Sequence, residues 1–120
     1  MPRSQHRVDA VPGDRHVRVE IGGRVVAETD RPVVVTETGL PARFYVPVED
    51  VDFTFLEPTG LSTHCPFKGD ARYWSFVDRD TGETRANAVW GYPEPLEGVA
   101  LIKDCVAFYD EAATITVSRN

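Results

Sequence analysis

Short runs in which hydrophobic and polar residues alternate recur along most of this chain. Between residues 16 and 21, for example, Val17, Val19 and Ile21 alternate with polar neighbours. A period of two is typical of a β-strand with one buried and one solvated face. Runs of this kind, together with a few continuous β-branched or aromatic runs, predict strands at residues 16–21, 24–28, 33–37, 43–46, 72–77, 84–90, 105–109 and 113–117.

Glycine, proline and acidic residues separate these runs. Gly22 and Gly23 can adopt the positive φ angles of a type I′ turn without strain, which indicates a tight hairpin. A proline followed by two acidic residues predicts a single helical turn at residues 48–51. Residues 57–62 contain proline and glycine and predict a loop, whereas residues 96–104 fit either a short helix or an irregular link.

Many short strands without a long amphipathic helix predict an all-β fold. We expect a small antiparallel barrel or sandwich of about eight short strands, with one or two short helical turns. A chain of 120 residues fits one domain, and we assign it to residues 16–120. Residues 1–15 contain two prolines and no periodicity, which predicts a flexible N-terminal arm.

Composition excludes several classes of partner. The net charge of −6 argues against attraction to nucleic acid phosphates or to anionic lipids. The start of the chain has no apolar core of a signal peptide, and no apolar run approaches the ~20 residues of a membrane span, so we expect a cytoplasmic protein. The two cysteines and three histidines lack zinc-ligand spacing. We therefore expect no metal and no other cofactor, and the sequence does not define an oligomeric state.

The stretch from residue 62 to residue 74 carries a thiol, an imidazole, an amine, a carboxylate and a guanidinium. Cys65 could act as a nucleophile with its pKa lowered by neighbouring cations, although a free cysteine is more often a small buried hydrophobic residue. His64 would point away from Cys65 on a strand, which weakens a Cys–His pair. Lys68 precedes Gly69 in a turn and could bind an anion or remain a solvated lysine.

Two further pairs of polar residues each share one face of a predicted strand. Arg43 and Tyr45 are two residues apart, as are Arg85 and Asn87. If these faces line a pocket, the arginine can bind a carboxylate or phosphate while its neighbour orients the ligand. The alternative is a solvated outer face with cross-strand charge pairs.

Other candidates are less specific. The acids Glu37, Glu49 and Asp50 could serve as general bases or metal ligands, but their spacing does not single out any of them. Large aromatic residues are expected mainly in the core, and an aromatic rim around a ligand pocket is the alternative. These aromatic residues are Trp74, Trp90, Tyr92, Phe108 and Tyr109.

Several blocks of residues together resemble the domain of unknown function 427 family. They are Phe44-Tyr45-Val46-Pro47 with Asp50-Val51, Cys65-Pro66-Phe67-Lys68-Gly69 with Ala71 and Tyr73, Asn87-Ala88-Val89-Trp90-Gly91-Tyr92 with Pro95, and Val106-Ala107-Phe108-Tyr109. The resemblance implies a small bacterial β-rich domain, similar in shape to zinc-ribbon-like tent folds without their cysteine pairs. It places the family's motif residues at Tyr45, Pro47, Asp50, Cys65, Lys68, Gly69, Tyr73, Trp90 and Tyr92.

The resemblance also brings a nucleotidyltransferase label, which such families sometimes carry. Enzymes of that kind hold magnesium with paired carboxylates that follow a Gly-Ser motif, and this sequence lacks that arrangement. We therefore expect a binding module for a small anionic or polar ligand, in a pocket around the turn that contains Cys65 and Lys68. The candidate ligand-binding residues are Arg43, Tyr45, Asp50, Cys65, Lys68, Tyr73, Asn87, Trp90 and Tyr92.

Three alternative functions remain open from the sequence. Cys65 and Lys68 are the candidate catalytic residues if the protein is an enzyme, with Cys65 as its nucleophile. A nucleotidyltransferase is the second alternative, and a protein-interaction module that uses an edge strand or an arginine-rich face is the third.

Overall fold

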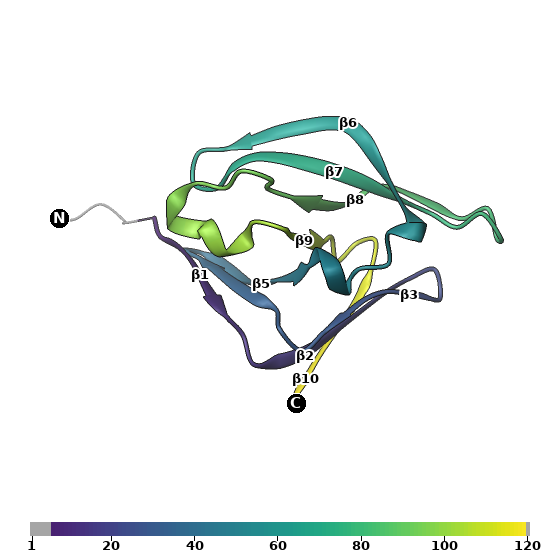
Figure 1. Ribbon diagram of the computed structural model, residues 1–120, viewed down its shortest axis with the longest axis horizontal. Helices are drawn as coiled ribbons and strands as arrows, with labels where there is room; N and C mark the ends of the chain where they lie inside the picture. Colours follow the sequence, from purple (N-terminus) through teal and green to yellow (C-terminus); the bar gives the residue numbers. More distant parts are fainter. Residues whose placement is uncertain (1–5, 120) are drawn as a thin grey trace.

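The computed structural model describes residues 6–119 and consists mainly of antiparallel strands in two sheets. Figure 1 shows the strands wrapping around a common interior. In sheet order, the seven-stranded sheet contains β1 (Val8–Pro12), β4 (Val33–Glu37), β5 (Leu40–Pro47), β9 (Cys105–Phe108), β8 (Thr84–Gly91), β7 (Gly69–Val77) and β6 (Leu56–Cys65). The three-stranded sheet contains β10 (Thr114–Arg119), β2 (Arg15–Ile21) and β3 (Arg24–Thr29). Three short 3-10 helices connect them, η1 (Val48–Asp50), η2 (Phe53–Phe55) and η3 (Glu97–Ile102).

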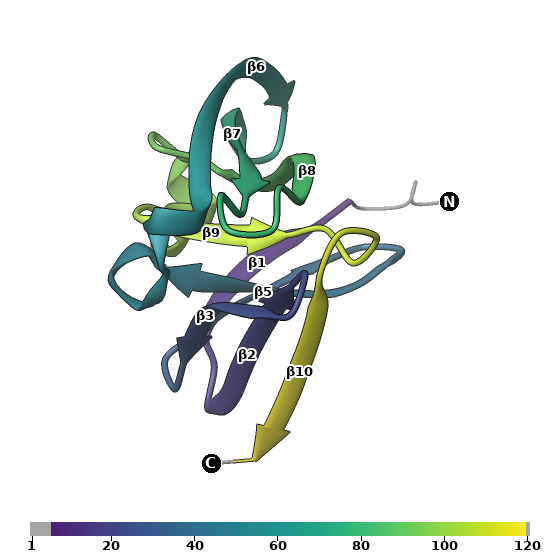
Figure 2. The ribbon, with the colours of Figure 1, turned by 90° about the vertical axis from the view of Figure 1, so that its right-hand side faces the viewer.

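The large sheet is buried on both of its faces near its centre. Its central strand β9 is buried along its whole length, because alternate residues belong to two different hydrophobic clusters. Val106 and Phe108 pack in a cluster that also contains Val17 and Val26 of the small sheet, and this cluster fills the space between the sheets. Figure 2 shows the small sheet below and the β6–β7 hairpin above.

The second hydrophobic cluster lies on the other face of the large sheet. Cys105 and Ala107 of β9 belong to it, together with aromatic residues of β5, β7 and β8. Strand β1 and helix η3 pack against each other, and both contribute side chains to this cluster, including Val8 from β1 and Ile102 from η3. This face of the sheet also carries the candidate site.

The all-β prediction is confirmed, but the structure corrects the number of strands and the assignment of residues 57–62. The described residues form ten strands rather than about eight. Residues 57–62 are not a loop, because they belong to the long strand β6 at the edge of the large sheet. Pro58 is tolerated there because an edge strand does not need every N–H group for pairing. The pairing of β6 with β7 is irregular between Pro58 and Ser62.

The prediction of a flexible arm at residues 1–15 is wrong for its second half. Val8–Pro12 forms the edge strand β1, which pairs with β4 from Val8 opposite Glu37 to Pro12 opposite Val33. Val8 and Ala10 pack against the second hydrophobic cluster, and this contact orders the strand. Residues 1–5, which were also part of the predicted arm, lie outside the described residues.

His16 on β2 couples the stability of the small sheet to pH. Its two ring nitrogens lie 2.5 Å from a carboxylate oxygen of Asp30 and 2.7 Å from one of Glu28. Hydrogen bonds to Asp30 and then to Glu28 raise the pKa of His16 above 6.5. A raised pKa in the folded state stabilises the protein fully below about pH 6.5, and this contribution is lost as the pH rises through the folded-state pKa.

We therefore expect the free energy of unfolding of the wild type to fall more steeply with rising pH than that of His16→Gln. Urea unfolding between about pH 5.5 and about pH 8.5 measures this difference. The other two histidines are present in both proteins, so their contribution cancels in the comparison. Parallel curves for the two proteins would show that His16 gains no such stabilisation from its carboxylate neighbours.

Candidate functional site

A tight turn between β6 and β7 holds Lys68 in position. The backbone N–H of Lys68 donates to the carbonyl of Cys65 at 3.2 Å, and its own carbonyl accepts from the N–H of Leu96 at 2.9 Å. Gly69 follows with φ +118, a value that favours glycine, and a Cβ at this position would lie 3.1 Å from the carbonyl oxygen of Glu94. The turn is therefore packed against the segment that leads into η3.

The side chain of Lys68 pairs with Glu37 at the end of β4. The Nζ atom lies 2.7 Å from Oε1 of Glu37, and the two side chains are only 13% and 15% exposed. The other oxygen of Glu37 lies 2.9 Å from the ring of His6. Burial opposes ionisation of Glu37, but hydrogen bonds from Lys68 and His6 outweigh it, so the pKa of Glu37 is lowered. At neutral pH Glu37 is therefore ionised.

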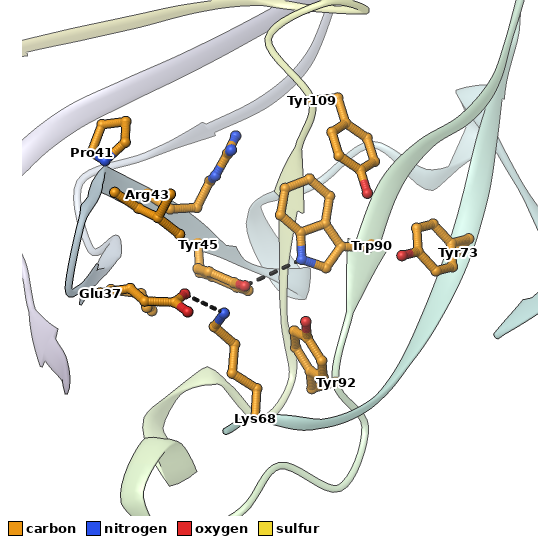
Figure 3. Close-up of a pocket in the computed structure, with 11 residues that line it drawn as sticks. Glu37, Pro41, Arg43, Tyr45, Lys68, Tyr73, Trp90, Tyr92 and Tyr109 are labelled. Carbon is orange, nitrogen blue, oxygen red and sulfur yellow. Dashed lines mark hydrogen bonds and ion pairs between the residues drawn. The ribbon is translucent and has the colours of Figure 1, made fainter. Parts of the chain in front are cut away.

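Lys68 and Glu37 form part of the wall of a cavity of about 230 Å³, which we call the tyrosine-lined cavity (Figure 3). All four tyrosines of the chain line it, namely Tyr45, Tyr73, Tyr92 and Tyr109. Trp90 forms part of the same wall, and Arg43 adds a second cation. The cavity thus combines aromatic walls with two positive charges and one negative charge.

The register of the strands explains why a hollow forms here. Trp90 on β8 pairs with Tyr73 on β7 and with Ala107 on β9. Val46 pairs with Val106, so the preceding residue Tyr45 lies next to Ala107 on the same face of the sheet. A small residue between two large ones leaves space, and the indole N–H of Trp90 donates across it to the hydroxyl of Tyr45 at 3.2 Å.

The hydroxyls of Tyr45, Tyr92 and Tyr109 are neutral hydrogen-bonding groups at physiological pH. Burial raises the pKa of Tyr45 to about 12 and also raises the pKa of Tyr92. Burial, with a further contribution from the hydrogen bond to Tyr73, raises the pKa of Tyr109 to about 12. The Tyr45 hydroxyl accepts from Trp90, so its own proton is free for donation, and within the described residues the Tyr92 hydroxyl has no hydrogen-bond partner.

Arg43 is held in place by three neighbours. Its guanidinium lies 5.0 Å from the ring centroid of Trp90, and one nitrogen donates to the carbonyl oxygen of Phe108 at 3.1 Å. The same nitrogen lies 3.7 Å from a carboxylate oxygen of Asp110. Trp90 also packs against Tyr109, with ring centroids 4.3 Å apart. These contacts orient the cation before any ligand arrives.

Comparison with family models shows the relationship of this chain to other proteins. Residues 9–119 match the model described as domain of unknown function (DUF427). The chain belongs to the DUF427 family. A comparison with curated proteins finds no match. Among the described residues of this DUF427 domain, no helix has the length and apolar character needed to cross a membrane.

The DUF427 domain brings six of the nine candidate ligand-binding residues into the tyrosine-lined cavity. They are Arg43, Tyr45, Lys68, Tyr73, Trp90 and Tyr92. Their role in binding stays a prediction, but they converge on one cavity from β5, β7, β8, the residue that follows β8 and the β6–β7 turn. The remaining three candidates lie elsewhere.

Asp50 and Asn87 do not line this cavity. Asp50 ends η1 and accepts a hydrogen bond from the hydroxyl of Thr29 at 2.6 Å, so it connects η1 to β3. Asn87 has φ 51, which breaks the alternation of β8. As a consequence, Ala88 and Val89 both belong to the cluster between the sheets, and the regular alternation expected for residues 84–90 is wrong.

Cys65 is half-buried and packs against the second hydrophobic cluster, but it does not line the tyrosine-lined cavity. The nearby imidazole of His64 instead pairs with Asp70 at 2.8 Å in an exposed position. Within the described residues, neither His64 nor Lys68 makes a hydrogen bond to the thiol. This geometry supports the interpretation of Cys65 as a small hydrophobic residue.

Sequence reasoning did not single out Glu37 as a partner of Lys68. It stood beside Glu49 and Asp50 as one of three acids of equal interest. The pairing joins residues 31 positions apart, and it arises because β1, β4 and the β6–β7 turn meet at one end of the sheet. No local pattern carries that information.

Among the described residues, no group of three histidine, cysteine, aspartate or glutamate side chains is arranged to hold a metal ion.

Proposed function

We propose that this DUF427 domain is a binding module for a small anionic molecule, which it holds in the tyrosine-lined cavity. One observation carries the proposal. The wall of the tyrosine-lined cavity has more hydrogen-bond donors than acceptors to pair with them. Tyr45 and Tyr92 have free hydroxyl protons, and Lys68 has three N–H groups, one of which donates to Glu37. An oxyanion supplies the acceptors that this wall lacks.

Charge supports the same class of ligand. Within the cavity wall, Arg43 and Lys68 are positive and Glu37 is negative, although the whole chain has a net charge of −6. Neutral tyrosine hydroxyls add donors without adding negative charge, because their pKa values are raised. Charge-assisted hydrogen bonds of this kind are roughly twice as strong as neutral ones.

The size of the cavity favours a compact ligand. Its volume of about 230 Å³ is below the ~300–1,000 Å³ of pockets that hold drug-sized molecules. The aromatic walls of Trp90 and Tyr109 can contact an apolar or planar part of the ligand while the donors fix its anionic group. A phosphate or a carboxylate on a small organic molecule fits this description.

A thermal-shift titration tests the proposal. Inorganic phosphate, acetate and benzoate are added at constant ionic strength, with chloride as the control anion. An anion present at 100 times its Kd stabilises the folded state by about 2.7 kcal/mol, so the midpoint of unfolding should rise with its concentration. If none of these anions raises the midpoint above the chloride control, the proposed function loses its support.

We expect Tyr92→Phe to weaken binding of the best anion by about tenfold, since it removes one hydrogen-bond donor and keeps the ring. Isothermal titration measures the change in Kd. The thermal midpoint of Tyr92→Phe without ligand should stay close to that of the wild type, because the hydroxyl has no partner within the described residues. Equal affinity of both proteins would place the ligand away from Tyr92.

A further inference from the structure

A second hollow lies beside the tyrosine-lined cavity. Its volume is about 310 Å³ and it is open to solvent at the surface. Strand β8 contributes Arg85 and Asn87, and the segment after β9 contributes Tyr109 and Glu111. Tyr109 lines both hollows. The two hollows therefore share Tyr109 as a common boundary.

The backbone at Asn87 has a conformation that asparagine tolerates better than most residues with a side chain. Its φ of 51 lies in the left-handed region, which costs a residue with a side chain more than glycine. The backbone N–H of Asn87 donates to the hydroxyl oxygen of Ser75 at 3.0 Å, and its side-chain oxygen accepts from the hydroxyl of Thr59 at 2.7 Å. The bond to Ser75 fixes the backbone, and the bond from Thr59 holds the side chain in one orientation.

The amide nitrogen of Asn87 has no partner within the described residues, so its two N–H donors are uncommitted, and Asn87 is one of the residues that line the second hollow. Arg85 is fixed beside it by a hydrogen bond from its guanidinium to the carbonyl of Ala112 at 3.0 Å and by an ion pair with Glu83. Glu111 is exposed and offers acceptors. The residues that line the second hollow therefore include both hydrogen-bond donors and hydrogen-bond acceptors.

We propose that the ligand of the DUF427 domain has two parts, with its anionic group in the tyrosine-lined cavity and a hydroxyl-bearing group that extends past Tyr109 into the second hollow. This inference rests on the proposed function. A hydroxyl group both donates and accepts, so it matches a site that combines the amide of Asn87, the guanidinium of Arg85 and the carboxylate of Glu111. The ring of Tyr109 can contact the carbon skeleton of the ligand. The class is thus a small polyol or sugar with a phosphate or carboxylate group.

Matched pairs of probes test the two-part ligand. Isothermal titration compares glycerol phosphate with inorganic phosphate, and gluconate with acetate, at constant ionic strength. In at least one pair, the hydroxyl-bearing anion should bind about tenfold more tightly than the bare anion, which corresponds to one or two added hydrogen bonds. The two pairs also distinguish a phosphate from a carboxylate as the anionic group.

Two substitutions at Asn87 test whether the second hollow provides the tenfold gain in affinity for the hydroxyl-bearing anion. Asn87→Gly keeps the left-handed backbone and removes the amide, and Asn87→Asp keeps the acceptor for Thr59 while it replaces the amide nitrogen by oxygen. Both should abolish the tenfold gain and leave the affinity for the bare anion unchanged. Asp104→Gly is the matched control, because Asp104 also has a positive φ of 62 and lines neither hollow.

Three other outcomes are possible, and each contradicts a different part of the proposal. Equal binding of bare and hydroxyl-bearing anions overturns the two-part ligand and leaves the proposed function intact. A gain that survives in Asn87→Gly and Asn87→Asp overturns the assignment of the second hollow. Failure of all four probes to bind overturns the proposed function and, with it, the two-part ligand.

Discussion

Lys68→Met is expected to weaken the binding of inorganic phosphate or acetate by about a hundredfold or more. The substitution removes a charge-assisted hydrogen bond to the anion, which contributes about 1.5–3 kcal/mol. It also leaves Glu37 without its partner at 2.7 Å, so a carboxylate then repels the anion inside the cavity. A hundredfold change in Kd corresponds to about 2.7 kcal/mol, and isothermal titration measures it.

The chain offers a matched control for this substitution. Lys103 is the second of its two lysines and is exposed at the end of η3, so Lys103→Met should bind anions like the wild type. The double variant Glu37→Gln with Lys68→Met should recover part of the lost affinity, since the repelling carboxylate is gone. Wild-type affinity in Lys68→Met would show that the anion does not contact this lysine.

Gly91→Ala is expected to lower the free energy of unfolding by about 1–3 kcal/mol, the usual cost of overpacking. Gly91 lies on β8 opposite Val106 of the central strand β9. A Cβ at this position would lie 2.8 Å from the carbonyl oxygen of Cys105 and 3.2 Å from a methyl group of Val106. The backbone carbonyl cannot move aside without disturbing the β8–β9 pairing. Denaturant unfolding with an unchanged m-value measures the loss.

Gly60→Ala is the control for this substitution. Gly60 also lies within a strand, β6, but a Cβ at Gly60 would have no atom within 4 Å. Its replacement should leave stability unchanged or raise it by up to about 1 kcal/mol, because alanine restricts the unfolded chain. Equal stability of Gly91→Ala and Gly60→Ala would mean that β8 and β9 leave room for a methyl group at Gly91.

The period of two identified the strands that have one buried and one solvated face. Residues 16–21 were predicted from this period and form most of β2, and the hairpin at Gly22 and Gly23 joins β2 and β3 as expected. Residues 33–37 were predicted from a continuous β-branched run, with the bounds that β4 has in the structure. The alternation is informative because a one-residue shift would move every apolar side chain to the wrong face.

The two edge strands of the large sheet were not predicted from the sequence pattern. β1 and β6 lie at the two edges of the large sheet, where one side of each strand pairs with nothing in the described chain. Edge strands tolerate proline and glycine, so Pro12 and Pro58 suggested an arm and a loop. Their pairing depends on partners elsewhere in the chain, which a local pattern does not reveal.

The candidate site was predicted where residue type and strand spacing were sufficient. Arg43 and Tyr45 share a face and reach the same cavity as Lys68. The partnership of Lys68 with Glu37 and the use of all four tyrosines in one wall depend on the order of the strands in the sheet. Asn87 was expected on a regular strand, but its backbone is left-handed, and it lines a separate hollow.

Nuclear magnetic resonance of the domain with labelled tyrosine rings tests the central claim most directly. The chain has four tyrosines, and all four line the proposed binding cavity. Each ring signal therefore reports on this cavity, and the signal of Tyr109 reports on the second hollow as well. We predict that titration with an anion that raises the thermal midpoint shifts the ring signals of Tyr45 and Tyr92 in a saturable way, and that Lys68→Met abolishes these shifts. Saturable binding of that anion with all four ring signals unmoved would contradict the account.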